Sequence, residues 1–346
     1  MTHVGISYEP VTVHGERGLL LHQEKFCLAL TTIPIDPKRA KQLNDKVTPA
    51  EQSQLRGSLG GLLFLCSTRN DLIADVIGLQ THICAPLVLH LKAANTLTNR
   101  AKLTPRRGLL FLKLTPPLRA LSISDASFAT SKTSYAIEGI LNLITEDTMA
   151  KKATSSVLDV AETKKLLNIK AHCLMVTGKK AKRISHSTSH AESLAAHGSL
   201  TGAELLAMRY TEIFLAPNAR ITDLLWYDDH AVYDLPIDHV TDCFDLVELV
   251  SGTRGVPQDR SQRLLVLSLR EKRMIGKLRH LMHCDTHDMA GNRLTKFDGQ
   301  DYALLQLMDT GKLCFKHGVT FRAAVQKPWA TYSGEDLHNR DLNQMD

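Results

Sequence analysis

The stretch that decides the fold runs from Leu118 to Ala129 and reads Leu-Arg-Ala-Leu-Ser-Ile-Ser-Asp-Ala-Ser-Phe-Ala. Its first part, Leu118–Ser124, has the apolar, β-type composition of a strand. Asp125 follows directly, so its carboxylate is expected at the carboxyl end of that strand. A single aspartate in such a place is far more often a turn or cap residue than a metal ligand. The functional interpretation therefore depends on what else reaches the same edge.

Two further acidic strings follow along the chain. Ser187–Glu192, Ser-Thr-Ser-His-Ala-Glu, opens a long helical pattern, and Val240–Asp245, Val-Thr-Asp-Cys-Phe-Asp, follows another β-type run. A strand, helix, strand arrangement can bring the carboxylates of Asp125, Glu192 and Asp242 to one point. Hard oxygen ligands of this kind suit Mg²⁺, and two such ions can flank a scissile phosphate. The three acids therefore predict a metal-dependent nuclease.

The order of elements supports a mixed α/β fold. Strands are expected at 107–114, 118–124 and 136–144, and the succession over residues 105–297 reads strand, strand, strand, helix, strand, helix, strand. This is the order of a ribonuclease H-like domain, in which the first strand, the first helix and the fourth strand each present a carboxylate at one edge. The polar, lysine-rich residues 145–170 are expected to be an insertion between strands.

The residues before this domain form a mostly helical leading module, 1–104. Thr48-Pro49-Ala50-Glu51 is a capping box with proline at the first helical position, so a helix is expected to start at Pro49. Further helices are expected at 71–82 and 86–99. Residues 298–346 form a C-terminal extension whose polar tail beyond Pro328 is expected to be disordered.

Basic residues gather in two places, within a net charge of +6. Residues 76–124 contain no Asp or Glu but carry seven basic residues, among them Arg106 and Arg107. A second run immediately precedes the Glu192 helix and consists of Lys179, Lys180, Lys182 and Arg183. Such surfaces attract the phosphates of nucleic acid, with a strength that falls as salt rises. The alternative is a solvated basic face without a partner.

The seven cysteines are scattered and never form a Cys-x-x-Cys pair, which argues against a disulfide framework and against a zinc ribbon. The amino terminus lacks the pattern of a signal peptide, and no apolar run approaches the roughly 18 residues of a membrane span. We therefore expect an intracellular protein, cytoplasmic or nuclear, without a membrane partner.

Five motifs in order carry a resemblance to a known family. They are Leu55–Leu65 (Leu-Arg-Gly-Ser-Leu-Gly-Gly-Leu-Leu-Phe-Leu), Ser124–Ala129, Ser187–Ala195, Thr241-Asp242 and Leu294-Thr295-Lys296. This succession resembles the Pol polyprotein of copia-type LTR retrotransposons, over roughly residues 17–297. Members of that family read approximately Arg-Ser-Leu-Val-Gly-Ser-Leu-Leu-Tyr-Leu, Ser-Asp-Ala-Asp-Trp-Ala, Ser-Ser-Thr-Glu-Ala-Glu, a strand-end Asp, and Ala-Asp-x-Leu-Thr-Lys.

The resemblance implies specific roles. Residues 1 to about 104 fall on the thumb and connection that follow a reverse transcriptase, and Asp125, Glu192 and Asp242 fall on the metal ligands of the ribonuclease H. The implied reaction is cleavage of the RNA strand of an RNA–DNA hybrid with two Mg²⁺ ions, for which Mn²⁺ can substitute. The implied partners are that hybrid and the remaining parts of a Pol polyprotein.

Two departures from the family matter. The alignment on Leu294-Thr295-Lys296 puts Asn292 at the fourth catalytic position, where the family has Asp, and this removes one negative charge. Asp288, one helical turn earlier, is a candidate substitute. A polymerase active site is also not expected, because it needs a Tyr-x-Asp-Asp type hairpin before the thumb and nothing before Arg17 supplies one. Trp226-Tyr227-Asp228-Asp229 lies between Glu192 and Asp242, inside the other domain, and is interpreted as a loop.

Three functions remain open from the sequence. The first is an active ribonuclease H, and the second is a decayed retroelement remnant that keeps the fold and at most binds nucleic acid. The third is another nuclease of the same superfamily, such as an integrase or resolvase, which would be favoured if Glu192 lay far from Asp125.

Overall fold

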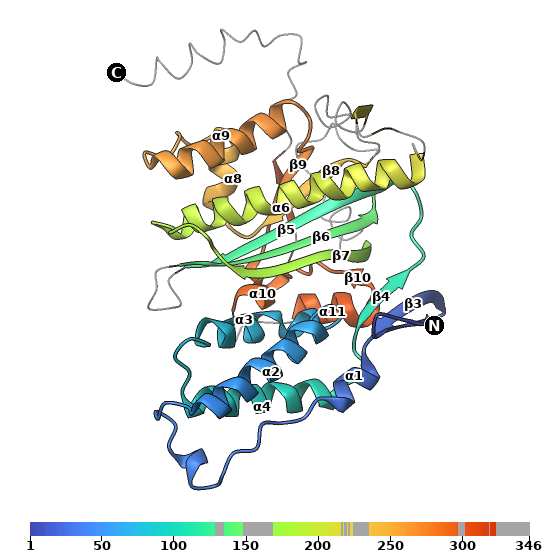
Figure 1. The fold of residues 1–346 in the computed structure, drawn as a ribbon. Coiled ribbons are helices and arrows are strands. Elements are labelled where there is room, and N and C mark those ends of the chain that lie inside the picture. The colour runs from blue at the N-terminus through green and yellow to red at the C-terminus, as the bar shows by residue number, and fades with distance from the viewer. Residues whose placement is uncertain are drawn as a thin grey trace.

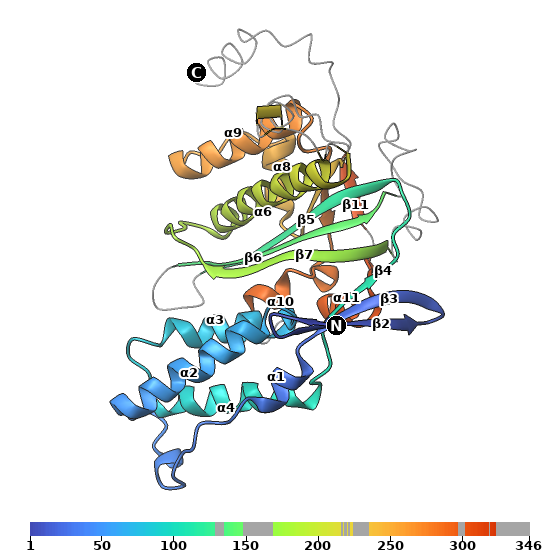
Figure 2. The same cartoon turned by 45° about the vertical axis from the view of Figure 1, so that its right-hand side comes forward.

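The structure, a computed structural model, describes residues 1–128, 135–147, 169–215, 217, 220, 222–223, 235–296, 302–317 and 319–322. Within these residues the chain forms two sheets, and helices cover both faces of the larger one (Figures 1 and 2). Most of the expected insertion, the Trp226–Asp229 motif and the expected C-terminal tail lie outside the described residues.

The larger sheet has seven strands in the order β10-β7-β6-β5-β8-β9-β11. Their bounds are β5 Leu118–Ser127, β6 Ile137–Glu146, β7 Ile169–Lys180, β8 Ile237–Thr241, β9 His280–Cys284, β10 Lys312–Leu313 and β11 Val319–Arg322. β6 is antiparallel to β5 and β7, whereas β8 is parallel to β5 and β9. β10 pairs with β7 at one border of the sheet, and β11 pairs with β9 at the other border. The five inner strands form a mixed sheet consistent with a ribonuclease H-like fold.

One face of this sheet is covered by α6 (Thr188–Tyr210), behind which lie α8 (Phe244–Ser251) and α9 (Arg260–Met274) (Figure 1). The expected start of α6 is confirmed, because the Ser187 hydroxyl accepts a hydrogen bond from the backbone N–H of His190 at 3.1 Å. Ala196 and Leu200 of α6 belong to an apolar core that also contains Ile237 of β8. Strand alternation turns Ala120 of β5 toward the same core.

The opposite face is covered by helices from both ends of the chain (Figure 2). They are α2 Pro49–Leu65, α3 Ile73–Thr81, α4 Val88–Leu103, α10 Asn292–Thr295 and α11 Tyr302–Thr310, with α1 Glu24–Ala29 alongside α4. Thr48 and Glu51 form the expected capping box of α2. A single apolar core contains Leu62 of α2, Leu121 of β5 and Leu304 of α11. The leading helices therefore pack on the sheet directly.

The smaller sheet corrects one detail of the expected order. It pairs β1 (Thr2–His3), β2 (Ile6–Val13), β3 (Glu16–His22) and β4 (Leu109–Leu112). The strand expected at 107–114 thus forms, but it pairs with β3 and not with the larger sheet. Pro116 and Pro117 follow it, and prolines cannot donate to a strand ladder, so β4 and β5 are separate strands.

The remaining short helices are η1 Arg39–Lys41, η2 Asn70–Leu72, η4 Thr286–Asp288 and the π-turn η3 Thr211–Leu215. Among the helices described, none joins enough length to enough apolar character to traverse a lipid bilayer.

Candidate metal centre

Strand register brings the first and third acids together. β5 and β8 are parallel neighbours, and their last aligned pair is Ile123 with Val240. Two residues further along each chain stand Asp125 and Asp242. Because parallel neighbours keep their register, these carboxylates leave the same edge of the sheet side by side. The placement expected from the sequence therefore follows from one strand pairing.

The second acid arrives from α6. Glu192 lies near the start of that helix, and its Oε1 accepts a hydrogen bond from the backbone N–H of Ala126 at 3.1 Å. Ala126 packs with Ala191 and Ala195, whose small side chains let the helix approach the strand end closely. The helix N-cap and this bond together fix the Glu192 carboxylate over the end of β5.

The three acids form one cluster. One carboxylate oxygen each from Asp125, Glu192 and Asp242 lies within 4.8 Å of the other two. Asp125 is 1% exposed and Glu192 4% exposed, while Asp242 is half-buried. The Glu192 Oε2 atom is buried without a hydrogen-bond partner among the described residues. An orphaned buried acceptor beside two further carboxylates is the arrangement that a divalent cation would satisfy.

The electrostatics of the cluster are unfavourable without a cation. Burial raises the pKa of Glu192 well above its usual range, and the charges of Asp125 and Asp242 raise it further. Burial likewise raises the pKa of Asp125, although the nearby ammonium of Lys296 and a hydrogen bond from Thr295 oppose this. Paired carboxylates with raised pKa values are common at functional sites.

α10 and the residue that follows it place two polar groups beside Asp125. Thr295 donates a hydrogen bond from its hydroxyl to Asp125 Oδ2, and the Lys296 ammonium lies 3.7 Å from Asp125 Oδ1. The helix can approach because β6 has Gly139 opposite Asp125, and a Cβ there would lie 2.8 Å from atoms of Leu294 and Thr295. The Leu294-Thr295-Lys296 motif stands out in the sequence only through its resemblance to the family. Nothing in the composition of this motif indicates that it contacts the acids.

Asn292, at the fourth predicted catalytic position, is bonded differently from the three acids. Asn292 is buried, its amide donates to the carbonyl oxygen of Thr286 at 2.6 Å, and its Oδ1 accepts a hydrogen bond from Lys296. Asp288, the candidate substitute, accepts hydrogen bonds from the backbone N–H of His317 at 2.7 Å and pairs with the His317 ring at 3.1 Å. Both side chains therefore already have partners.

The predicted phosphate-binding residues separate into two groups. Lys179 pairs with Glu138 at 3.3 Å and the Lys180 ammonium lies over the ring of Tyr135, while Lys182 and Arg183 are exposed before α6. Arg106 pairs with Glu9, and Arg107 makes a two-pronged bond to Asp309. The first group continues into the helix that carries Glu192, and the second lies before β4, on the other face of the sheet. Their role in binding nucleic acid stays a prediction.

Comparison with known proteins adds little beyond this geometry. No protein-family model matches the chain, and no curated protein matches it significantly. Among solved structures, a ribonuclease H1 isolated from compost by a metagenomic approach matches with 13% sequence identity and a TM-score of 0.29, covering 54% of this chain and 98% of its own.

Proposed function

We propose that this protein is a Mg²⁺-dependent ribonuclease H that cleaves the RNA strand of RNA–DNA hybrids. The observation that carries the proposal is the buried cluster of Asp125, Glu192 and Asp242, gathered from β5, α6 and the end of β8. Glu192 lies close to Asp125, so the wide separation that would favour an integrase or resolvase is not found.

The donor set fits magnesium. Three carboxylates offer only oxygen ligands, and the orphaned Glu192 Oε2 adds an acceptor with no competing partner in the described structure. Bound Mg²⁺ would supply electrophilic stabilisation of the phosphate and of the attacking water. Asp125 and Asp242 hold their oxygens at the strand ends, and the Ala126 amide orients Glu192. Thr295 orients Asp125 from the opposite side.

The finer assignments rest on the resemblance. We propose that the chain is part of a copia-type Pol polyprotein, that residues 1 to about 104 correspond to a reverse transcriptase thumb and connection, and that the rest of that polyprotein is a partner. Substrate recognition would then depend on the shape and 2′-hydroxyls of a hybrid, not on its sequence.

The test is cleavage of a hybrid with a labelled RNA strand, beside single-stranded RNA and duplex DNA. Wild-type protein should nick only the RNA of the hybrid and only with Mg²⁺ or Mn²⁺. Asp125→Asn and Glu192→Gln should each lower the rate by about a thousandfold, since metal stabilisation is worth several kcal/mol. Asp245→Asn is the matched control, because Asp245 follows Asp242 closely but is exposed and pairs with Arg254. Cleavage that persists in EDTA would falsify the proposal.

A second candidate is a remnant that binds nucleic acid without turnover. The observation that favours it is the neutral Asn292, which stands where the family has a fourth acid and whose Oδ1 is already hydrogen-bonded to Lys296, the residue that also lies 3.7 Å from Asp125. In that case wild-type protein binds hybrid but does not cleave it with either metal, and Asp125→Asn leaves the affinity unchanged.

A further inference from the structure

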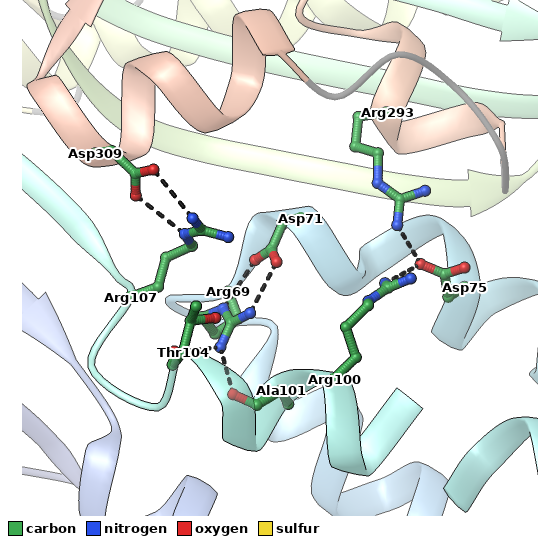
Figure 3. A network of polar contacts seen from close by, with 9 residues as sticks. All are labelled: Arg69, Asp71, Asp75, Arg100, Ala101, Thr104, Arg107, Arg293 and Asp309. Atoms are coloured by element: carbon green, nitrogen blue, oxygen red, sulfur yellow. Dashed lines mark hydrogen bonds and ion pairs between the residues drawn. The ribbon is translucent and has the colours of Figure 1, made fainter. Parts of the chain in front are cut away.

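A pocket lined by four arginines lies between the leading helices and α10, which contributes Arg293 (Figure 3). It holds about 180 Å³ of space. The side chains that matter to the argument are those of Arg69, Asp71, Arg100, Thr104, Arg107 and Arg293. None of them belongs to the acid cluster, and the residues between 100 and 107 come from the acid-free stretch of the sequence.

The floor of the pocket is rigid. Arg69 is 1% exposed and makes a two-pronged bond to Asp71, with N–O distances of 2.9 and 2.8 Å. Its Nη1 also donates to the carbonyl oxygens of Ala101 and Thr104 at the end of α4. These bonds neutralise Arg69 and fix the turn from which Thr104 and Arg107 project. Arg69 is thus a structural anchor.

Arg100 is only partly neutralised. Asp75 accepts from the Nη2 atoms of both Arg100 and Arg293, so two guanidinium groups share one carboxylate (Figure 3). The Arg100 side chain is 42% exposed, whereas that of Arg293 is 5% exposed. Arg100 Nε and Nη1 have no acceptor among the described residues. The accessible positive charge at the pocket mouth therefore belongs mainly to Arg100.

Two neighbouring groups add donors. Arg107 binds Asp309 through Nε at 3.0 Å and Nη2 at 3.1 Å, which leaves its Nη1 without an acceptor in the described structure. Thr104 also lines the pocket, and its hydroxyl has no hydrogen-bond partner among the described residues. The Nε and Nη1 donors of Arg100, the remaining Nη1 of Arg107 and the hydroxyl of Thr104 are groups of the kind that proteins use to bind phosphate oxygens.

The size of the pocket selects the ligand. Sites for whole drug-sized molecules occupy roughly 300–1,000 Å³, so the space here admits a phosphate with part of a sugar but not a complete nucleotide. We propose that this pocket binds one backbone phosphodiester of a nucleic acid strand, with Arg100 as the main contact and Thr104 and Arg107 as supporting donors. The proposed function is needed only to name the strand, since binding requires no cleavage.

The first experiment measures binding of labelled hybrid in EDTA over a series of salt concentrations. Arg100→Gln should weaken binding roughly tenfold, and it should reduce the slope of log affinity against log salt by about 0.7 to 0.9, as expected for one lost phosphate contact. Thr104→Val should weaken binding about threefold with an unchanged slope. The fold should survive, because Asp75 keeps Arg293, and equal melting temperatures would verify this.

Arg209→Gln is the matched control, because Arg209 is exposed at the end of α6 and pairs only with Glu212 in the described structure. Its affinity and salt slope should equal those of wild type. If Arg100→Gln behaves like Arg209→Gln, the proposal is rejected.

The second experiment separates the two sources of phosphate. Inorganic phosphate is added at constant ionic strength against chloride, and the melting temperature is followed. If phosphate stabilises wild type but not Arg100→Gln while hybrid binding is unaffected by the substitution, the pocket takes a free phosphorylated molecule and the assignment to a strand is overturned. Conversely, Arg100-dependent binding of hybrid that is never cleaved with Mg²⁺ supports the pocket and rejects only the proposed ribonuclease.

Discussion

The two ends of strands β5 and β8 carry buried charges in opposite circumstances. At one end Asp238 is fully buried, and it accepts hydrogen bonds from Arg119 at 2.8 Å, from Arg279 at 2.6 and 2.9 Å, and from His280 at 2.9 Å. Arg279 in turn binds Asp147 through two nitrogens. At the other end the carboxylates of the acid cluster face one another, and only Lys296 faces them as a countercharge among the described residues.

The difference shows that burial alone does not identify a functional acid. Although burial would raise the pKa of Asp238, hydrogen bonds from Arg279 and His280 hold it well below its usual range. For Glu192 burial raises the pKa, and the charges of Asp125 and Asp242 raise it further, while Lys296 opposes them only in part. A buried carboxylate with a full set of cationic partners stabilises the fold, whereas one that lacks them is poised for a ligand.

The largest effect is expected from Asp238→Asn. Removing this charge leaves Arg119 and Arg279 without their shared partner, so the free energy of unfolding should fall by about 3–5 kcal/mol. Asp242→Asn should leave it unchanged or slightly higher, because it removes a repulsion. Urea unfolding of both variants without metal provides the measurement, and equal losses would remove the distinction between the two ends.

His239, in the middle of β8, should make the stability of the fold depend on pH in the acid range. His239 is fully buried, its ring nitrogens bond the hydroxyls of Ser122 and Ser124, and burial lowers its pKa to about 3. A lowered pKa means that the unfolded state binds the proton more tightly, so stability is complete above the unfolded pKa of about 6.5 and falls as the pH drops from there toward 3. Each pH unit within that window costs about 1.4 kcal/mol.

The check is a comparison with His239→Gln. This variant should have a lower free energy of unfolding than wild type at neutral pH. The difference between the two free energies should be smaller by about 3 kcal/mol near pH 4.5. Urea unfolding at the two pH values measures it. A gap that stays constant would mean that His239 does not titrate with folding.

The acid cluster should change the stability of the fold with pH in the direction opposite to that of His239, and by a smaller amount. Folding raises the pKa of Glu192. The contribution of Glu192 to stability is therefore complete below the pKa of the unfolded state, and it is lost as the pH rises through the pKa of the folded state. At neutral pH Glu192→Gln should therefore raise the melting temperature of the metal-free protein by about 2 °C. Mg²⁺ should stabilise wild type and not the variant. A lower melting temperature in EDTA would contradict the repulsion inferred here.

The smallest effect concerns the internal countercharge. Lys296→Met removes the ammonium beside Asp125, so the metal-free protein should melt about 1 °C lower. Mg²⁺ should bind about threefold more tightly, because the ion no longer competes with a fixed cation. Titration calorimetry in the two proteins would show it, and weaker Mg²⁺ binding by the variant would argue that Lys296 supports the site.

Local signals in the sequence predicted much of this arrangement. The capping box at Thr48 and the N-cap at Ser187 depend on neighbouring residues, and both form as expected. The acids at strand ends were found in the same way. Asp238 and Asp242, however, lie only four residues apart, and their different environments depend on the distant partners of Asp238, namely Arg119, Arg279 and His280.

Long-range pairing accounts for what the sequence did not reveal. β4 has the composition of any buried strand, and its choice of β3 as partner depends on residues nearly a hundred positions earlier. The contact of Lys296 with Asp125 similarly requires α10 to settle against Gly139. Such choices are decided by tertiary packing, which a residue pattern does not record.

The two short strands β10 and β11, which lie on opposite borders of the sheet, bear on the order of synthesis. Both belong to the stretch 312–322, near the end of the described chain. While a ribosome is still making those residues, the outer edge of β9 from Leu281 to Cys284 lacks its partner strand and can pair with other chains, whereas β10 covers only Ile169 and Lys170 of β7. A protein cut after residue 311 would remain permanently in that state, so we expect it to self-associate even though its acid cluster is complete.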